Sequence, residues 1–142
     1  MSAVKLVAVF SENKPGEAAR ITKIIADAGV NIRWVTIAST GGFGVMKLLV
    51  DKCDAAMLAL KQKGVAVNSI EALAIEVKDQ GGALQAVSEC LSKNSINLEN
   101  TSGFVAKHRA ILILEMHDVA KAAGVLQKQG MRVLSQEEML NL

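Results

Sequence analysis

The feature that most constrains the fold of this chain is an internal repeat. When the 142 residues are compared with themselves at an offset of 66 positions, the two halves align without a gap. Identical residues coincide, for example Gly16 with Gly82, and apolar positions match as well, for example Ile25 with Leu91. Solenoid repeats are about 20 to 50 residues long, so each copy is expected to be a small complete fold rather than a stacking unit.

The repeat predicts two domains, at residues 1–69 and 70–142. In the second domain the repeat extends to about residue 135, and a short tail, 136–142, lies outside it. The length of the whole chain suits one ordinary domain or two very small ones.

Hydrophobic periodicity predicts the same order of elements in each copy, β-α-β-β-α-β. In copy one we expect strands at 6–10, 31–38, 45–50 and 65–68, and helices at 18–28 and from about 56 to a stop at Gly64. The turn Gly41-Gly42-Phe43-Gly44 joins the second and third strands as a hairpin. In copy two the corresponding segments are 72–77, 82–94, 96–104, 110–116, 118–129 and 131–134.

This order predicts an α+β fold of two ferredoxin-like βαββαβ domains in tandem, with antiparallel sheets and helices on one face. Right-handed crossovers place the first and third strands of each copy at the centre and the second and fourth at the edges. The most apolar segments, 6–10 and 110–114, fall at predicted central strands.

Composition excludes several classes of function. The net charge is +2, so no strong field attracts nucleic acid, a membrane surface or an acidic partner. Aromatic residues make up 3% of the chain, too few for the stacking surface of an RNA-binding sheet. The longest apolar run, 55–60, is too short to span a bilayer, and the N-terminus does not resemble a signal peptide. We therefore expect a cytoplasmic protein that binds neither nucleic acid nor membrane.

The residues that could supply chemistry are scattered. Cys53, Cys90, His108 and His117 have no metal-ligand spacing, and both cysteines are expected to be small core hydrophobes. His108 lies in a basic turn that we expect to be solvated, and His117 precedes a helix cap at Asp118. No nucleophile, base and orienting group occur together, so no catalytic residue, metal or cofactor is assigned.

Two helix starts could bind a small zwitterion. A helix N-terminus offers unpaired N–H groups to a carboxylate, and Gly16 and Gly82 would let a ligand approach the backbone. Asn13 or Asp79 could cap the helix or face the ligand. Each residue also has a plainer interpretation: the glycines start helices, and Asn31 and Asn97 (the equivalent pair) are turn residues.

The residues around these helix starts resemble the ACT domain, a small-molecule-sensing module of amino-acid metabolism. Copy one carries Asn13-Lys14-Pro15-Gly16 and then Ala26-Asp27-Ala28-Gly29-Val30-Asn31-Ile32. Copy two carries the more degenerate Asp79-Gln80-Gly81-Gly82 and Lys93-Asn94-Ser95-Ile96-Asn97-Leu98. Copy two departs from copy one at Gly81, in place of Pro15. Where the family often has a large aliphatic residue, copy one has Ala18 and copy two Leu84.

The resemblance covers nearly the whole chain and implies a tandem ACT protein that binds a free amino acid at an interface between ACT copies. The implied partners are that amino acid, a metabolic enzyme or regulator as target, and a second chain in a homodimer. The candidate ligand-binding residues are Asn13, Lys14, Pro15, Gly16, Asn31, Ile32, Asp79, Gly81, Gly82, Asn97 and Leu98.

Arg33 and Glu99 occupy equivalent positions at the predicted second strands. If the copies pack with these strands adjacent, the opposite charges would pair across the seam and two open sheet edges would be covered. The alternative is that both side chains are solvated. Two further functions stay open: an assembly module that pairs through its sheet edges without a ligand, and an enzyme of unrecognised type.

Overall fold

The structure, a computed structural model, describes residues 3–142 and divides into two compact units. The N-terminal unit is Lys5–Ile70, and the C-terminal unit is Glu71–Leu142 together with Ala3 and Val4. Each unit is described separately below.

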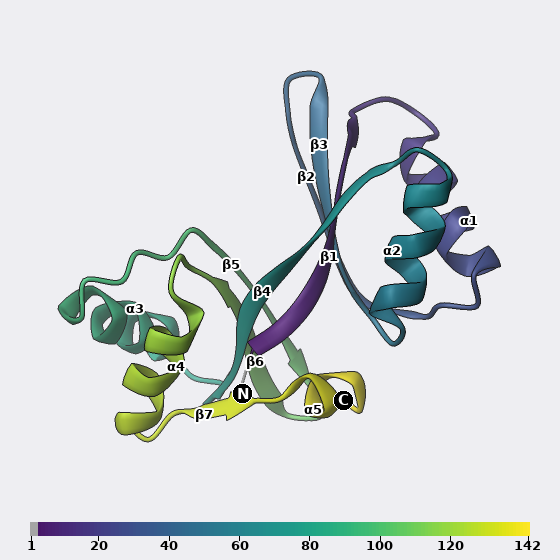
Figure 1. Cartoon of the computed structure of the whole chain (residues 1–142). Helices are drawn as coiled ribbons and strands as arrows, with labels where there is room; N and C mark the ends of the chain where they lie inside the picture. The colour runs from purple at the N-terminus through teal and green to yellow at the C-terminus, as the bar shows by residue number, and fades with distance from the viewer. Residues whose placement is uncertain (1–2) are drawn as a thin grey trace. The chain divides into compact units, whose positions relative to one another are not determined.

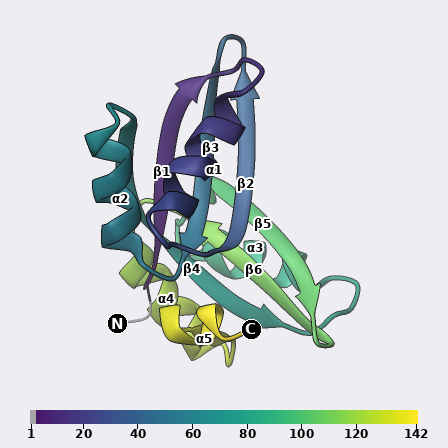
Figure 2. The same cartoon turned by 90° about the vertical axis from the view of Figure 1, so that its right-hand side faces the viewer.

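The N-terminal unit contains two helices on one face of its strands (Figures 1 and 2). Its elements are β1 (Ala3–Glu12), α1 (Glu17–Asp27), β2 (Ile32–Thr40), β3 (Phe43–Val50), α2 (Cys53–Gln62) and the first part of β4 (Ala66–Val77). The hydrogen-bonded strand order is β2-β3-β1-β4. In the antiparallel register Val7 pairs with Leu48 and Phe10 with Val45.

The core of this unit follows from the two periodicities in the sequence. Ile21 and Ile25, one turn apart on α1, are fully buried against Leu60 of α2 and Val9 of β1. Alternate residues of β1 and β3 point to this core because side chains change sides at each strand position. Cys53 is half-buried against the same core.

The C-terminal unit repeats the arrangement. Its elements are the second part of β4, α3 (Ala83–Lys93), β5 (Asn100–Ala106), β6 (Arg109–Glu115), α4 (Val119–Lys128), β7 (Arg132–Leu134) and α5 (Gln136–Leu140). The strand order is β4-β6-β5, with β7 paired to β4. Val87 and Leu91 of α3 and Leu126 of α4 are fully buried in one core, and Cys90 packs against that core. The Asp118 side chain accepts the Lys121 backbone N–H, so the predicted cap is confirmed.

Both units therefore have the predicted α+β, ferredoxin-like order, with the first and third strands of each copy central. One predicted strand boundary is wrong: 96–99 are not part of β5. The Ile96 N–H instead donates to the Leu91 carbonyl at 2.9 Å, after Ser95 in the left-handed region (φ 58°). Ile96 thus completes the end of α3, and the strand begins later.

The two strands predicted at 65–68 and 72–77 are one strand, β4, of twelve residues. No glycine or proline occurs between Val65 and Val77 to interrupt it. Its first residues belong to the N-terminal unit and the rest to the C-terminal unit.

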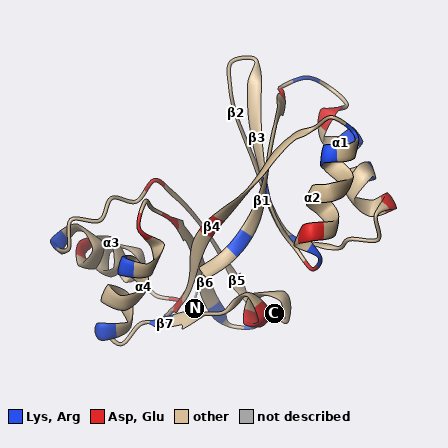
Figure 3. Ribbon diagram, in the orientation of Figure 1, with Lys and Arg blue, Asp and Glu red and all other residues tan. Residues whose placement is uncertain are grey.

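The tail beyond the repeat forms α5. Ser135 and Glu138 make a reciprocal capping box, and Met139 is only 2% exposed. Within the described residues no helix is long and apolar enough to cross a membrane. Lys, Arg, Asp and Glu occur in both units, over helices as well as strand ends (Figure 3).

Candidate functional site

Both predicted helix starts are made by a glycine in the left-handed region. Gly16 has φ 91° and precedes α1, and Gly82 has φ 85° and precedes α3. A Cβ at either position would meet nothing within 4 Å, so only the backbone conformation requires glycine. Neither helix start has a side-chain cap. Of the two roles considered for Asn13 and Asp79, capping is therefore excluded, and facing a ligand stays a prediction. The open approach to the backbone is present.

The polar residues of the two loops make different contacts. The Asn13 backbone N–H donates to the Gly42 carbonyl at 2.8 Å, and its side-chain Nδ2 donates to the Gly41 carbonyl at 3.4 Å. Asn13 is thus bound to the β2–β3 turn, whereas the Asp79 carboxylate is exposed and lines a cavity. Asn13 binds this turn because its side-chain amide can donate to a carbonyl, whereas the carboxylate of Asp79 has no proton to donate.

Lys14 pairs with Glu12, the two charged groups being 3.2 Å apart. Because the Lys14 ammonium group already pairs with Glu12, a ligand carboxylate would have to compete with Glu12 for it. Pro15 and Gly81 lie in the exposed loops immediately before the two helix-starting glycines.

The residues predicted to open the second strand of each copy lie away from the helix-starting glycines. Asn31 and Ile32 line a shallow hollow of about 480 Å³ beside α1, and Asn97 and Leu98 line one of about 490 Å³ beside α3. The two hollows are equivalent in the repeat, and neither is lined by a helix-starting glycine. The structure therefore does not bring the loop residues and the strand-start residues of one unit into a common hollow.

The Asn31 backbone is held by Asp51. Its N–H donates to Asp51 Oδ1 at 2.9 Å, and its carbonyl accepts the Asp51 N–H at 3.1 Å. These bonds fix the start of β2 and do not use the Asn31 side chain.

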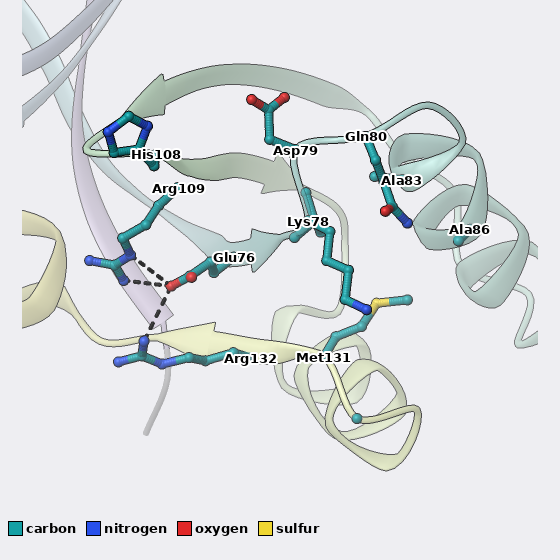
Figure 4. Close-up of a pocket in the computed structure, with 12 residues that line it drawn as sticks. Glu76, Lys78, Asp79, Gln80, Ala83, Ala86, His108, Arg109, Met131 and Arg132 are labelled. Atoms are coloured by element: carbon teal, nitrogen blue, oxygen red, sulfur yellow. Dashed lines mark hydrogen bonds and ion pairs between the residues drawn. The ribbon is translucent and has the colours of Figure 1, made fainter.

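The cavity of about 700 Å³ lies wholly in the C-terminal unit, between the loop before α3, the β5–β6 turn and β7 (Figure 4). It is lined by Glu76, Val77, Lys78, Asp79, Gln80, Ala83, Ala86, His108, Arg109, Gly130, Met131 and Arg132. Of the predicted site residues, only Asp79 lines this cavity. His108, expected in a solvated turn, is exposed and forms part of the wall.

One wall of the cavity is a network of ion pairs. Glu76 Oε1 accepts from Arg109 Nε at 2.9 Å, from Arg109 Nη2 at 2.6 Å and from Arg132 Nη1 at 3.2 Å. Arg132 Nη2 also donates to Glu138 of α5. The hydrogen bonds from Arg109 hold the pKa of the Glu76 carboxyl below its ordinary value, and the charge of Arg132 acts in the same direction.

Two further charged residues, Lys78 and Asp79, line the cavity from the loop before α3. Lys78 and Asp79 are exposed, and among residues 3–142 neither side chain takes part in an ion pair or hydrogen bond. Figure 4 shows the Lys78 side chain running toward Met131 and the Asp79 carboxylate pointing the other way, so the lining carries a cation and an anion on different sides, together with small or flexible apolar surface from Ala83, Ala86 and Met131. Such a lining suits a small molecule with both charges.

Sequence reasoning missed Glu76, Arg109 and Arg132, which three different strands bring together. A signal was present in the repeat: the equivalent positions in copy one are Phe10, Phe43 and Ala66. Three charged residues at positions that are apolar in the other copy distinguish the C-terminal unit. In the N-terminal unit Phe10 and Phe43 are instead exposed, at 48% and 73%.

Arg33 and Glu99 lie in different units, Arg33 within β2 and Glu99 just before β5. The Glu99 backbone N–H donates to the Glu115 carbonyl at 2.9 Å. The pairing of the two side chains across a seam between the copies stays a prediction.

The described residues contain no group of three or more His, Cys, Asp or Glu side chains placed to hold a metal ion. Burial raises the pKa of the Cys53 thiol, which favours its neutral form. A neutral, half-buried thiol agrees with its packing against the core.

Comparison with known proteins identifies the family. A family model described as an ACT domain pair matches residues 1–142. The chain is similar in structure to protein BT0572 from Bacteroides thetaiotaomicron, with a TM-score of 0.92 and 26% identity over 99% of this chain and 98% of that one. No curated protein matches it.

Two more distant structures share the fold. The regulatory subunit of aspartate kinase from Thermus thermophilus has a TM-score of 0.60 and 14% identity, over 90% of this chain and 93% of that one. The corresponding subunit from Thermus flavus has a TM-score of 0.59 and 12% identity, over 90% and 92%. With the repeat, the strand order and the glycine-started helices, the family match establishes that this chain belongs to the ACT domain family as a tandem pair.

Proposed function

We propose that this ACT pair is a regulatory protein, not an enzyme, which binds a free amino acid and alters a metabolic enzyme or regulator. The observation that carries the proposal is the cavity of the C-terminal unit, where Lys78 and Asp79 make no ion pair or hydrogen bond with any other residue of 3–142. A free amino acid offers one carboxylate and one ammonium group, which match this pair of opposite charges.

The expected binding free energy is in the range of a metabolite sensor. Hydrogen bonds to charged groups contribute about 1.5 to 3 kcal/mol each, and ordering the ligand offsets part of the sum. The expected affinity is therefore micromolar to millimolar, about −8 to −4 kcal/mol. Binding in this range responds to changes in metabolite concentration.

The fold shared with the regulatory subunits of aspartate kinase supports a regulatory role. We extend the proposal to the target: a metabolic enzyme or regulator in the cytoplasm whose activity follows the amino-acid level.

Thermal-shift measurements with each of the twenty amino acids test the proposal. One or two of them are expected to raise the melting temperature of the wild-type protein. Lys78→Met and Asp79→Asn should each remove that shift while leaving the unliganded melting temperature nearly unchanged, because both side chains are exposed. Lys121→Met, an exposed lysine outside the cavity, is the matched control and should keep the full response. A flat response of the wild-type protein to all twenty contradicts the proposal.

The position and exposed residues of β2 favour a second function, assembly through a sheet edge. This strand ends the strand order, and Val35 and Ile37 on it are 48% and 61% exposed. An open edge with exposed apolar side chains is a template for pairing with another strand. A homodimer formed through β2 is compatible with amino-acid binding in the C-terminal unit.

A further inference from the structure

We propose that the turn between β5 and β6 recognises the side chain of the bound amino acid. His108 forms a hydrogen bond with a carboxylate or carboxamide oxygen at the end of that side chain, so the ligand class is aspartate, asparagine, glutamate and glutamine. The inference rests on the proposed function, since it names the ligand class of the same cavity.

This turn has a backbone that its own sequence does not favour. Ala106 pairs with Arg109 in the antiparallel register, so only Lys107 and His108 connect the two strands. Both residues are in the left-handed region, at φ 51° and φ 64°. A two-residue hairpin turn with this conformation favours Asn-Gly or Gly-Gly, because a larger side chain in the left-handed region is strained.

The first copy has glycine at both equivalent positions of its hairpin. Gly41 corresponds to Lys107 and Gly42 to His108, and Gly41 is also left-handed, at φ 63°. Strained residues of this kind cluster at functional sites. Of the two side chains in the second copy, His108 lines the cavity and Lys107 does not. The strain therefore points to His108 as a residue of the binding site.

The imidazole ring of His108 is available to a ligand. It is exposed, and among residues 3–142 it takes part in no hydrogen bond or ion pair. Arg109, the next residue, is by contrast bound to Glu76 through Nε and Nη2. Figure 4 shows the His108 ring above Arg109, toward the same side of the view as the Asp79 carboxylate. The ring can donate an N–H to a ligand oxygen.

The position of His108 selects the length and the end group of the ligand side chain. The proposed function places the charged backbone groups of the ligand at Lys78 and Asp79, in the loop before α3, whereas His108 belongs to a separate element of the lining. A serine or threonine hydroxyl is attached too close to the ligand backbone to span the two elements, and aliphatic side chains have no acceptor. Lysine and arginine side chains carry only donors and would bring a cation beside Arg109. A terminal carboxylate or carboxamide meets both requirements.

Two glycine variants make a matched pair. His108→Gly removes the imidazole ring, and Lys107→Gly makes the equivalent change at the neighbouring residue, outside the cavity lining. Glycine adopts the left-handed region without strain, so neither variant should lower the melting temperature of the unliganded protein. A fall of more than about 2 °C in both variants would show that the turn is not strained and would overturn the proposal.

The test is a thermal-shift titration in about 0.15 M salt, which screens the exposed charge of Lys107. The probes are L-glutamate, L-glutamine, L-aspartate and L-asparagine, with L-norvaline as a hydrocarbon analogue of glutamine. Wild type and Lys107→Gly should reach half-saturation with at least one oxygen-bearing probe at a concentration at least about threefold lower than with L-norvaline. His108→Gly should lose this difference, because it weakens the oxygen-bearing probe and leaves L-norvaline unchanged. A response to the two acids or to the two amides supports the proposal and identifies the group that His108 binds.

The failure of this inference differs from the failure of the proposed function. If wild type is stabilised only by amino acids outside the four named, the inference is overturned and the proposed function holds. The same conclusion follows if His108→Gly keeps the wild-type difference between the probes. If none of the twenty amino acids stabilises wild type, the proposed function is wrong and the inference falls with it.

Discussion

Two adjacent glycines before α3 have different structural requirements. Gly82 is in the left-handed region at φ 85°, whereas Gly81 is not, and an added Cβ meets no atom within 4 Å at either residue. The left-handed conformation costs an L-residue about 1 to 2 kcal/mol. Gly82→Ala is therefore expected to lower the free energy of unfolding by that amount in urea titrations. Gly81→Ala, the matched control, should change it by less than about 0.5 kcal/mol. Equal losses of unfolding free energy in the two variants would contradict this prediction, because they would show that steric contacts rather than the left-handed φ of Gly82 set the cost.

The second residue-scale prediction concerns Glu76 and pH. Its pKa is lowered in the folded protein, so its interactions stabilise the fold above the unfolded pKa and are lost as the pH falls through the folded value. Glu76→Gln is expected to be less stable than wild type at pH 7. The difference in the free energy of unfolding should shrink as the pH falls below about 4.5.

Urea titrations of wild type and variant from pH 7 to pH 3 measure this difference. Glu71→Gln makes the same charge change at an exposed position outside the cavity and should track wild type throughout. A gap between wild type and Glu76→Gln that stays constant with pH would contradict the role of the Glu76 carboxylate.

At the scale of elements, α5 is held by a single deeply buried side chain among its described residues, Met139. Truncating a buried methionine to alanine costs about 2 to 5 kcal/mol. A terminal helix can detach without unfolding the rest of the chain. We therefore expect Met139→Ala to lower the free energy of unfolding by about 2 kcal/mol, the lower end of this range. The measurement is the free energy of unfolding by urea, with faster hydrogen exchange in α5. Leu84→Ala, at a 48% exposed position of α3, is the control and should be nearly neutral.

The helices and central strands could be predicted from the sequence because they follow local periodicity. Ile21 and Ile25 give the buried face of α1, and alternate apolar residues give β1. The cavity could not be predicted in this way. Glu76, Arg109 and Arg132 are far apart in the sequence and meet only because β4 pairs with both β6 and β7. The contact between Asn13 and the β2–β3 turn depends likewise on tertiary structure and leaves no local signal.

At the scale of the whole molecule, the open edge of β2 predicts a homodimer. We expect light scattering to give twice the chain mass of 15.0 kDa. Ile37→Lys places a charge on the exposed edge strand and should return the protein to the monomer mass without unfolding it, since Ile37 is 61% exposed. Leu58→Lys, at a 59% exposed position on α2, is the matched control and should leave the dimer intact.

The continuous strand β4 has a consequence for how such a protein can be divided or rearranged. An ancestral duplication would ordinarily leave a connecting loop at which the copies could later be exchanged, cleaved or fused to other modules. Here the joint became a strand whose backbone hydrogen bonds serve both copies, so cutting near residue 70 removes structure from each half. A break in this strand therefore takes ordered residues from both units, and neither unit keeps its full set of strands when the chain is divided there.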